Sequence, residues 1–225
     1  MCRAQAARLP RAVTPFFRDA AVSEPKRILL LFAHPAFHKS RINRYMVQAA
    51  RDIPGLTVHD LYEAYPDFHV DVPREQAALA EHEIIVFQHP FYWYSVPALL
   101  KEWEDLVLEY GFAYGAQGTA LQGKWLLSAV TTGGSAAAYH VEGVNRYPVR
   151  QLLTPFELTA RLCGMAYLPP FVVHGTHGIL QDAELAAVGR SYRALLAALS
   201  EGRLGPGDLA AQPMIDGRAG LDEGQ

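Results

Sequence analysis

Unbroken runs of apolar residues alternate along the chain with stretches in which apolar residues recur every three or four positions. The runs predict buried strands at residues 28–32, 56–61, 84–87, 125–130 and 171–173, because strands covered on both faces lose the alternation of polar and apolar side chains. The amphipathic stretches predict helices between and after these strands. We therefore predict an α/β fold: a doubly wound five-stranded parallel sheet with helices on both faces.

The two ends of the chain differ in composition from its long middle segment. Residues 1–25 combine arginine, proline and small residues without the continuous apolar segment of a signal peptide. From residue 201 onward, glycine, proline and charged residues dominate. We therefore predict a disordered N-terminal arm at residues 1–25, one domain at residues 26–200 and a loose C-terminal tail at residues 201–225.

Composition narrows the class of partner. With 225 residues, 50% hydrophobic content and a net charge of -3, the chain is typical of a soluble domain with a small-molecule ligand. No basic cluster favours nucleic acid, and no apolar run is long enough to span a bilayer. Two distant cysteines indicate a reducing, cytoplasmic location. Histidines pair at positions 34/38 and 174/177, but no metal motif accompanies them, so we predict no metal site.

The strand at residues 28–32 runs into a loop and a helix that begins after Ser40. Unpaired N–H groups at such a helix start attract an anion, and Ser40 and Asn43 would add side-chain donors. The loop fits neither the dinucleotide fingerprint nor the P-loop, which leaves a monophosphate such as that of FMN. The candidate phosphate residues are His34, Ser40, Arg41, Ile42 and Asn43. The alternative is an ordinary corner in which Ser40 only caps the helix.

The strand at residues 84–87 leads into four consecutive aromatic residues: Phe91, Tyr92, Trp93 and Tyr94. Aromatic side chains on a loop are costly to expose unless they cover a flat group, and the isoalloxazine ring of a flavin is flat. We therefore predict that these residues hold a flavin ring. The alternative is that they pack between the sheet and a partner subunit.

The strand at residues 125–130 ends in Thr131, Thr132, Gly133 and Gly134. Paired glycines let backbone N–H groups approach a ligand, and such donors stabilise the negative charge of a reduced flavin. Tyr139 would add a hydroxyl donor, although the segment could also be only a flexible loop. Because doubly wound sheets bind ligands at the carboxyl ends of their strands, the three strand ends predict one shared site.

Several long segments resemble a known family. From Arg27 to Leu199 the chain is similar to the flavodoxin-like NAD(P)H quinone oxidoreductases, which include DT-diaphorase and the ancillary oxidoreductases of glutathione-gated potassium efflux systems. The matching segments are, in order, AHP with SxxN, YPDFHVDVPREQ, QHPFYWYSVPALLKEWEDLV, FAYG with GTALQGK, VTTGG and CGMAYLPPFVVH. The resemblance implies a flavodoxin-like fold and an FMN-binding homodimer that takes hydride from NAD(P)H and passes it to a quinone by a ping-pong route.

The resemblance also assigns residues by position. His34 and residues 40–43 would hold the FMN phosphate and ribityl chain, and the two later strand ends would hold the ring. Tyr139 falls where the family has a tyrosine of the hydride and charge relay, but Asn145 stands in place of the partner histidine, and His140 is the histidine nearby. FMN rather than FAD is implied, because the C-terminal region that DT-diaphorase uses for FAD has no match. Candidates to line the partner subunit's site are Tyr110, Phe112 and Tyr114.

Three other functions compete with a quinone reductase. The chain could be a regulatory subunit on the cytosolic face of a potassium efflux transporter, with its oxidoreductase activity secondary and its location peripheral to the inner membrane. A one-electron carrier is disfavoured, because such carriers present a strongly acidic rim and this chain is close to neutral. An azo- or nitroreductase would use the same chemistry with another acceptor, and the residues do not separate NADH from NADPH.

Overall fold

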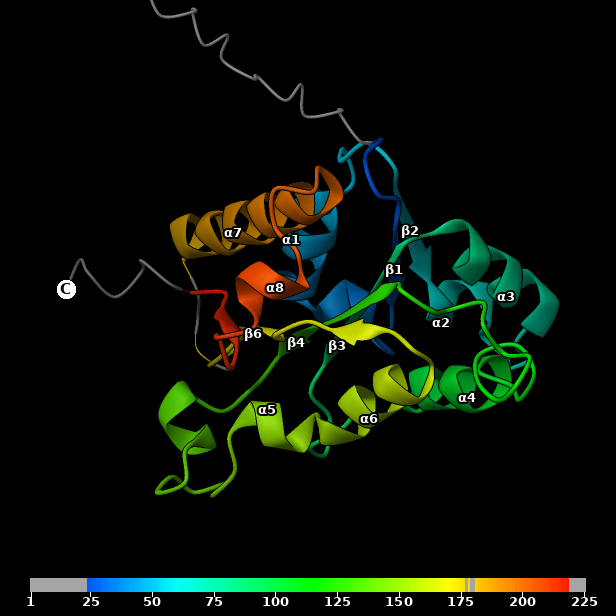
Figure 1. Cartoon of the computed structure of the whole chain (residues 1–225). Coiled ribbons are helices and arrows are strands. Elements are labelled where there is room, and N and C mark those ends of the chain that lie inside the picture. The colour runs from blue at the N-terminus through cyan, green and yellow to red at the C-terminus, as the bar shows by residue number, and fades with distance from the viewer. Residues whose placement is uncertain (1–23, 177, 179–180, 219–225) are drawn as a thin grey trace, which may run out of the picture.

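The computed structural model describes residues 24–176, 178 and 181–218. A seven-stranded parallel sheet forms its centre, in the order β2-β1-β3-β4-β6-β7 with β5 paired to β4 (Figure 1). The strands are β1 (Ile28–Phe32), β2 (Leu56–Asp60), β3 (Ile84–Pro90), β4 (Trp125–Thr131), β5 (Ala166–Tyr167), β6 (Phe171–Val173) and β7 (Ile215–Asp216). The predicted doubly wound α/β fold is confirmed. The two-residue strands β5 and β7 were not among the five predicted, because two residues are too few to show a pattern.

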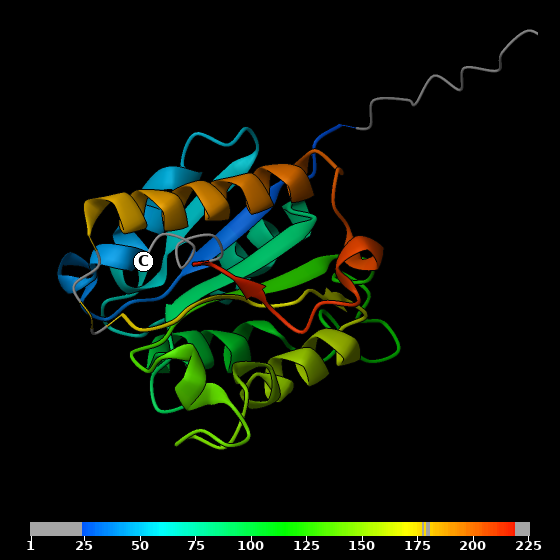
Figure 2. The same ribbon diagram turned by 90° about the vertical axis from the view of Figure 1, so that its left-hand side faces the viewer.

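Helices cover both faces of the sheet, as Figure 2 shows from the side. They are α1 (Arg41–Ala50), α2 (Leu61–Ala64), α3 (Val72–Glu81), α4 (Ala98–Val107), α5 (Val149–Leu152), α6 (Thr154–Leu162), α7 (Asp182–Ser200) and α8 (Pro206–Leu209), with 3-10 turns η1 (Phe37–Lys39) and η2 (Ala136–Tyr139). Helices α1 and α7 pack together on one face, and α4, α5 and α6 lie on the other (Figures 1 and 2). Parallel strands require this arrangement, since each crossover places its helix on the sheet.

Strand β1 shows why the sheet is buried on both sides. All five of its residues are buried, and they alternate between two cores: Leu29 and Leu31 face α3, α4 and α6, while Ile28, Leu30 and Phe32 face α1 and α7. Strand β3 is also buried along its whole length. These strands therefore hold their carboxyl ends at fixed positions, which is where the loops of the candidate site begin.

The C-terminal segment corrects one expectation. Residues 201–218 were expected to be loose, but they form α8 and the strand β7, whose residues pair with β6. The Ile215 N–H donates to the Pro170 carbonyl and the Gly217 N–H to the Val172 carbonyl, at 2.8 Å each. A Cβ at Gly217 would lie 2.7 Å from Val173, so glycine permits this close approach. Glycine-rich composition thus marks a tightly docked segment here, not a flexible one.

The remaining expectations about the ends fall mostly on undescribed residues. Of the predicted arm, only Glu24 and Pro25 lie within the described part of the chain, and residues 219–225 lie outside it. Among the described residues, no helix is both long enough and apolar enough to cross a membrane.

Candidate flavin site

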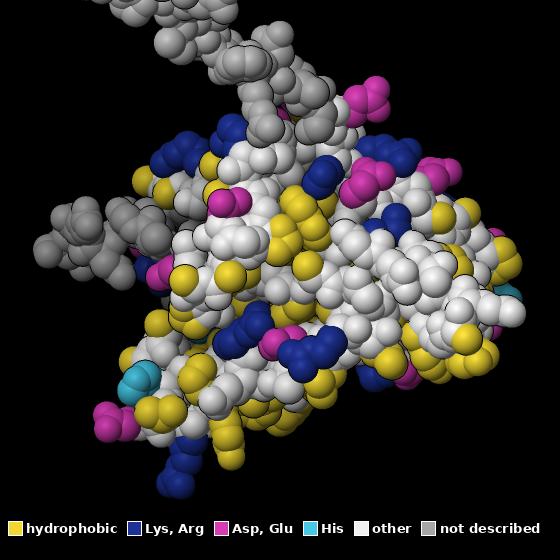
Figure 3. Space-filling model, viewed as in Figure 1, with side chains coloured by type: hydrophobic (Ala, Val, Ile, Leu, Met, Phe, Trp, Pro, Cys, Tyr) yellow, Lys and Arg dark blue, Asp and Glu magenta, His cyan; other side chains and the backbone are white. Residues whose placement is uncertain are grey.

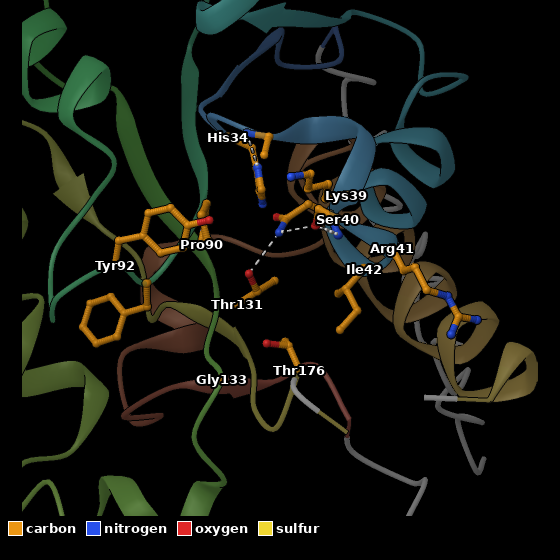
Figure 4. A pocket seen from close by; sticks show the side chains of 13 residues that line it. His34, Lys39, Ser40, Arg41, Ile42, Pro90, Tyr92, Thr131, Gly133 and Thr176 are labelled. Atoms are coloured by element: carbon orange, nitrogen blue, oxygen red, sulfur yellow. Dashed lines mark hydrogen bonds between the residues drawn. The ribbon is translucent and has the colours of Figure 1, made fainter. Parts of the chain in front are cut away.

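A pocket of about 420 Å³ opens where the loops after β1, β3 and β4 meet (Figure 4). This volume lies in the range of small-molecule sites. Its wall consists of His34, Ala36, Lys39, Ser40, Arg41, Ile42, Asn43, Pro90, Phe91, Tyr92, Thr131, Gly133 and Thr176. All five candidate phosphate residues therefore border one cavity together with residues of both other strand ends. Of the remaining candidates, Trp93, Tyr94, Thr132, Gly134 and Tyr139 lie outside this lining, on the turns beside it.

The start of α1 supplies donors to this pocket. Ser40 adopts an extended backbone and caps the helix, because its Oγ accepts the backbone N–H of Asn43 at 3.3 Å. The N–H groups of Arg41 and Ile42, which line the pocket, have no acceptor among the described residues. Unpaired N–H groups and the positive end of the helix dipole together favour an anion at this corner.

His34 is held in one tautomer. The Ala36 N–H donates to Nδ1 of His34 at 3.0 Å, so Nδ1 is the unprotonated nitrogen and Nε2 carries the hydrogen. Figure 4 shows the ring directed toward the pocket. Burial is the largest influence on its pKa, and together with the nearby His38 it lowers the pKa below the usual value despite an opposing backbone hydrogen bond. The imidazole is therefore a neutral donor near pH 7.

The Asn43 side chain makes its hydrogen bonds to other residues of the protein. Its side chain is 2% exposed, and Nδ2 donates to Ser40 Oγ at 3.1 Å and to Thr131 Oγ1 at 3.0 Å (Figure 4). Gln88 Nε2 donates to the Asn43 Oδ1 at 3.3 Å. Both amide hydrogens are thus used within the protein, and the contact of Asn43 with a phosphate stays a prediction. Asn43 ties the start of α1 to β3 and β4.

This network determines what Ser40 can offer to a ligand. Its Oγ accepts two hydrogen bonds, one from the backbone N–H of Asn43 and one from the side-chain Nδ2. A hydroxyl has two lone pairs and one hydrogen, so the hydrogen is left to point into the pocket that Ser40 lines. Asn43 therefore turns Ser40 into a donor that is already oriented.

The aromatic segment after β3 forms a strained turn. Trp93 and Tyr94 have φ angles of 51° and 62°, a conformation that side chains other than glycine rarely adopt. The turn closes through the Ser95 N–H, which donates to the Tyr92 carbonyl at 2.9 Å. The N–H groups of Trp93 and Tyr94 have no acceptor within the described residues, and Trp93 is 92% exposed. The turn thus presents two backbone donors beside the pocket, while the Trp93 side chain projects into solvent instead of lining it.

The segment after β4 presents donors in a similar way. The Thr132 hydroxyl donates to the Gly134 carbonyl at 2.8 Å and closes the turn. Neither Gly133 nor Gly134 has an acceptor for its N–H within the described part of the chain. A Cβ at Gly134 would lie 3.0 Å from the Tyr139 ring, so glycine lets Tyr139 approach this turn. The segment is therefore an ordered turn, and its hydrogen bonds do not support a flexible loop.

Tyr94 and Tyr139 lie beside this turn, and each has a polar residue next to it. Burial raises the pKa of Tyr139, as does the nearby Tyr94, so its hydroxyl stays protonated near neutral pH. The Tyr94 hydroxyl donates to Oδ1 of Asn145 at 3.2 Å. His174, at the end of β6, has its ring centre 5.7 Å from that of Tyr139. His140 instead accepts the N–H of Glu142 on the exposed side of its loop.

His174 is a residue that sequence reasoning considered only for metal spacing. It lies 35 positions from Tyr139 in the sequence, and only the pairing of β6 with β4 brings the two together. The sequence could have indicated this contact, because the strands that precede Tyr139 and His174 were both predicted and neighbouring parallel strands end at the same edge of the sheet. Among the described residues, no group of three or more His, Cys, Asp or Glu side chains is placed to hold a metal ion, and His177 lies outside that part of the chain.

Fold and site together define a flavodoxin-like protein with a pocket at the carboxyl ends of its parallel strands. The family described as "Flavodoxin-like fold" matches residues 26–196, and the chain belongs to this family. Over 176 residues it is 51% identical to the glutathione-regulated potassium-efflux system ancillary protein KefG of Pectobacterium carotovorum, a match that covers 78% of this chain and 96% of KefG. The resemblance that the sequence motifs carry is therefore confirmed.

Solved structures place the chain near flavin-binding proteins. The general stress protein 14 of Treponema denticola, in complex with FMN, is 40% identical with a TM-score of 0.72, over 77% of this chain and 99% of that one. An NADPH-quinone reductase from P. pentosaceus is 30% identical with a TM-score of 0.67, over 77% of this chain and 97% of that one. Similarity to quinone reductases thus accompanies similarity to KefG.

Proposed function

We propose that this protein is an FMN-binding ancillary protein of a potassium-efflux system. The observation that carries the proposal is 51% identity across 96% of the length of KefG, which supports the transporter-associated function better than a free-standing quinone reductase. In that function the protein would lie at the cytoplasmic side of the inner membrane, held there by the transporter. In this proposal the flavin site still catalyses a reductase reaction, but that reaction is secondary to the association with the transporter.

The residues at the pocket fit FMN. We propose that the Ser40 hydroxyl, the His34 Nε2–H and the N–H groups at the start of α1 bind its phosphate, because these donors surround one corner of the pocket. The ring would lie between the turns at residues 91–94 and 131–134, whose backbone N–H groups offer donors to its polar edge. Bound FMN would supply two-electron transfer from NAD(P)H to a quinone or to another flat acceptor.

Two experiments test the two parts of this proposal. Purified protein is titrated with FMN, then mixed with NADPH or NADH and afterwards with menadione while the flavin absorbance is recorded. Loss of the band on adding the nucleotide and recovery on adding the quinone is expected. Separately, potassium efflux is measured in cells that express a glutathione-regulated efflux transporter with and without this protein. Higher efflux with the protein is expected. Equal efflux would contradict the transporter-associated function and leave the reductase activity as the only function proposed.

The Tyr139→Phe variant tests the chemistry of the ring site. We expect flavin reduction by NAD(P)H to be about 10-fold slower, because a hydroxyl donor near the developing charge is lost, while FMN affinity stays within about twofold. Stopped-flow absorbance measures the reduction rate. Tyr147→Phe is the matched control, since Tyr147 is an exposed tyrosine on the same loop region. Equal reduction rates in wild type and Tyr139→Phe would remove Tyr139 from the mechanism.

We also propose that the protein is a homodimer. Tyr110 is 72% exposed, and exposed apolar side chains gather over α6, where Leu158 and Leu162 are more than half exposed (Figure 3). Large apolar side chains on a surface favour association with another protein surface. Sedimentation equilibrium of the FMN-loaded protein is expected to give twice the mass of one chain.

A further inference from the structure

A second cavity, of about 250 Å³, lies beside the candidate flavin site. One side comes from the loop after β4 and the other from the C-terminal segment that forms β7. Its wall consists of Ser135, Ala136, Ala137, His174, Gly175, Asp216 and Arg218. Two of these residues, Asp216 and Arg218, lie beyond the segment that matches the family, residues 26–196. The cavity is therefore built in part by a segment that the family does not define.

The C-terminal segment places the Arg218 side chain at this cavity. Nη1 of Arg218 donates to the His174 carbonyl at 3.4 Å, and Nη2 lies 3.5 Å from the Glu184 carboxylate. The guanidinium also lies against Gly175, where a Cβ would come within 3.3 Å of Nη1. Its side chain remains 27% exposed. Because both contacts are long and a guanidinium has five N–H groups, Arg218 retains donors for a ligand.

Asp216 supplies an acceptor in the same cavity. Its Oδ1 accepts the backbone N–H of Arg218 at 2.9 Å, and its Oδ2 has no donor among the described residues. Among the residues that the structure describes, the cavity therefore presents one carboxylate and one guanidinium. Enzymes that use pyridine nucleotides recognise the adenosine ribose with these two groups: a carboxylate binds the 2′-hydroxyl of NADH, and an arginine binds the 2′-phosphate of NADPH.

The cavity also lies at the right place for such a nucleotide. His174 lines it, and the centre of its ring is 5.7 Å from that of Tyr139, beside the turn that would hold the flavin. The Gly175 N–H donates to the Gly134 carbonyl at 2.9 Å, so the segment that carries His174 and Gly175 at the cavity is bonded directly to the turn. A dinucleotide whose nicotinamide lies at the flavin could therefore extend into the cavity with its other half.

We propose that this cavity binds the adenosine ribose of the pyridine nucleotide, with Arg218 binding the 2′-phosphate of NADPH and Asp216 the 2′-hydroxyl of NADH. The two residues then determine the choice between the two donors. This inference rests on the proposed function, in which a pyridine nucleotide reduces the site.

The test uses nucleotide fragments and the full-length, FMN-loaded protein. Isothermal titration calorimetry measures binding of adenosine 2′,5′-bisphosphate and of 5′-AMP to wild type, Arg218→Gln and Asp216→Asn. We expect Arg218→Gln to weaken the bisphosphate about 10-fold and to leave 5′-AMP within about twofold, because only the charged hydrogen bonds to the 2′-phosphate are lost. Asp216→Asn is expected to strengthen the bisphosphate, since a like charge is removed. Arg190→Gln, on an exposed part of α7, is the control.

Steady-state kinetics give an independent readout. The ratio of kcat/KM for NADPH to that for NADH is expected to fall about 10-fold in Arg218→Gln and to rise in Asp216→Asn. Unchanged bisphosphate affinity and an unchanged ratio in Arg218→Gln would overturn the proposal, even if both nucleotides reduce the flavin. If the bisphosphate binds through Arg218 but neither nucleotide reduces the flavin, the nucleotide site stands and the proposed reductase activity fails.

Discussion

Replacing both Ser40 and Asn43 by alanine is expected to weaken FMN binding by about 30-fold. Ser40 loses a hydrogen bond to a charged phosphate, and a hydrogen bond of this kind contributes about 2 kcal/mol, or about 30-fold in affinity. In this arrangement Asn43 has no amide hydrogen left for a phosphate, since both of them bond within the protein. Its removal frees a lone pair of Ser40, so the hydroxyl hydrogen can turn away from the pocket. Fluorescence titration of FMN against each variant measures the affinity.

The double-mutant cycle separates direct contact from positioning. We expect about 30-fold for each single variant, and a double variant well short of their product, because Asn43 acts through Ser40. Arg44→Ala is the matched control, since Arg44 is an exposed neighbour on α1 that does not line the pocket. Thermal unfolding of the apo-proteins shows whether a loss of affinity reflects a loss of fold. Effects that multiply in full would contradict the positioning function of Asn43, and unchanged affinity in the double variant would remove the phosphate site.

The fold was largely predictable because its central strands β1, β3 and β4 are buried along all or nearly all of their length. The run at residues 28–32 has no polar residue, and only a central parallel strand buries such a run so completely. The docked C-terminal segment was not predictable, because its contacts depend on Gly217 fitting against Phe171 and Val173, residues more than 40 positions away. A glycine in a short segment has the same appearance in a sequence whether it frees the chain or allows close packing.

In the candidate site too, local sequence patterns predict some features, and others depend on residues far away in the sequence. That Ser40 caps a helix at a strand end follows from local patterns, and the structure has this cap. The partners of Asn43 could not follow from the sequence, because Gln88 and Thr131 come from strands 45 and 88 positions away. The left-handed backbone at Trp93 and Tyr94 also lacked a signal, since aromatic residues do not favour it. Residue types indicated a ligand site, while the functions of individual side chains depended on long-range contacts.

Acid is expected to destabilise this protein partly through one histidine, His89. Its side chain is completely buried next to the ring of Phe156, and Nδ1 donates to the Pro90 carbonyl at 3.0 Å. Its Nε2 has no partner among the described residues. A charge there would lie in an apolar core, so burial lowers the pKa of His89 to about 4. The folded protein therefore keeps this imidazole neutral down to about pH 4.

The direction of the effect follows from the two states. The unfolded chain binds a proton at His89 below its ordinary pKa of 6.5, whereas the folded protein does so only near pH 4. Proton uptake by the unfolded chain lowers the free energy of unfolding as the pH falls between these values. One pKa unit corresponds to about 1.4 kcal/mol, so His89 alone is expected to cost about 3 kcal/mol between pH 7 and pH 4. His34 and His174, whose pKa values are also lowered mainly by burial, act in the same direction.

His89→Leu is expected to remove that share of the pH dependence. At pH 7 the free energy of unfolding of the variant should lie within about 1 kcal/mol of the wild-type value. The lost Nε2 had no partner, and the Pro90 carbonyl, which loses the Nδ1–H, still accepts the N–H of Tyr92 at 3.1 Å. Urea unfolding followed by circular dichroism at several pH values gives the free energies. His69→Gln, at an exposed histidine, serves as the control. If the difference between wild type and His89→Leu stays constant from pH 7 to pH 4, then His89 does not titrate between its folded and unfolded states as its burial requires.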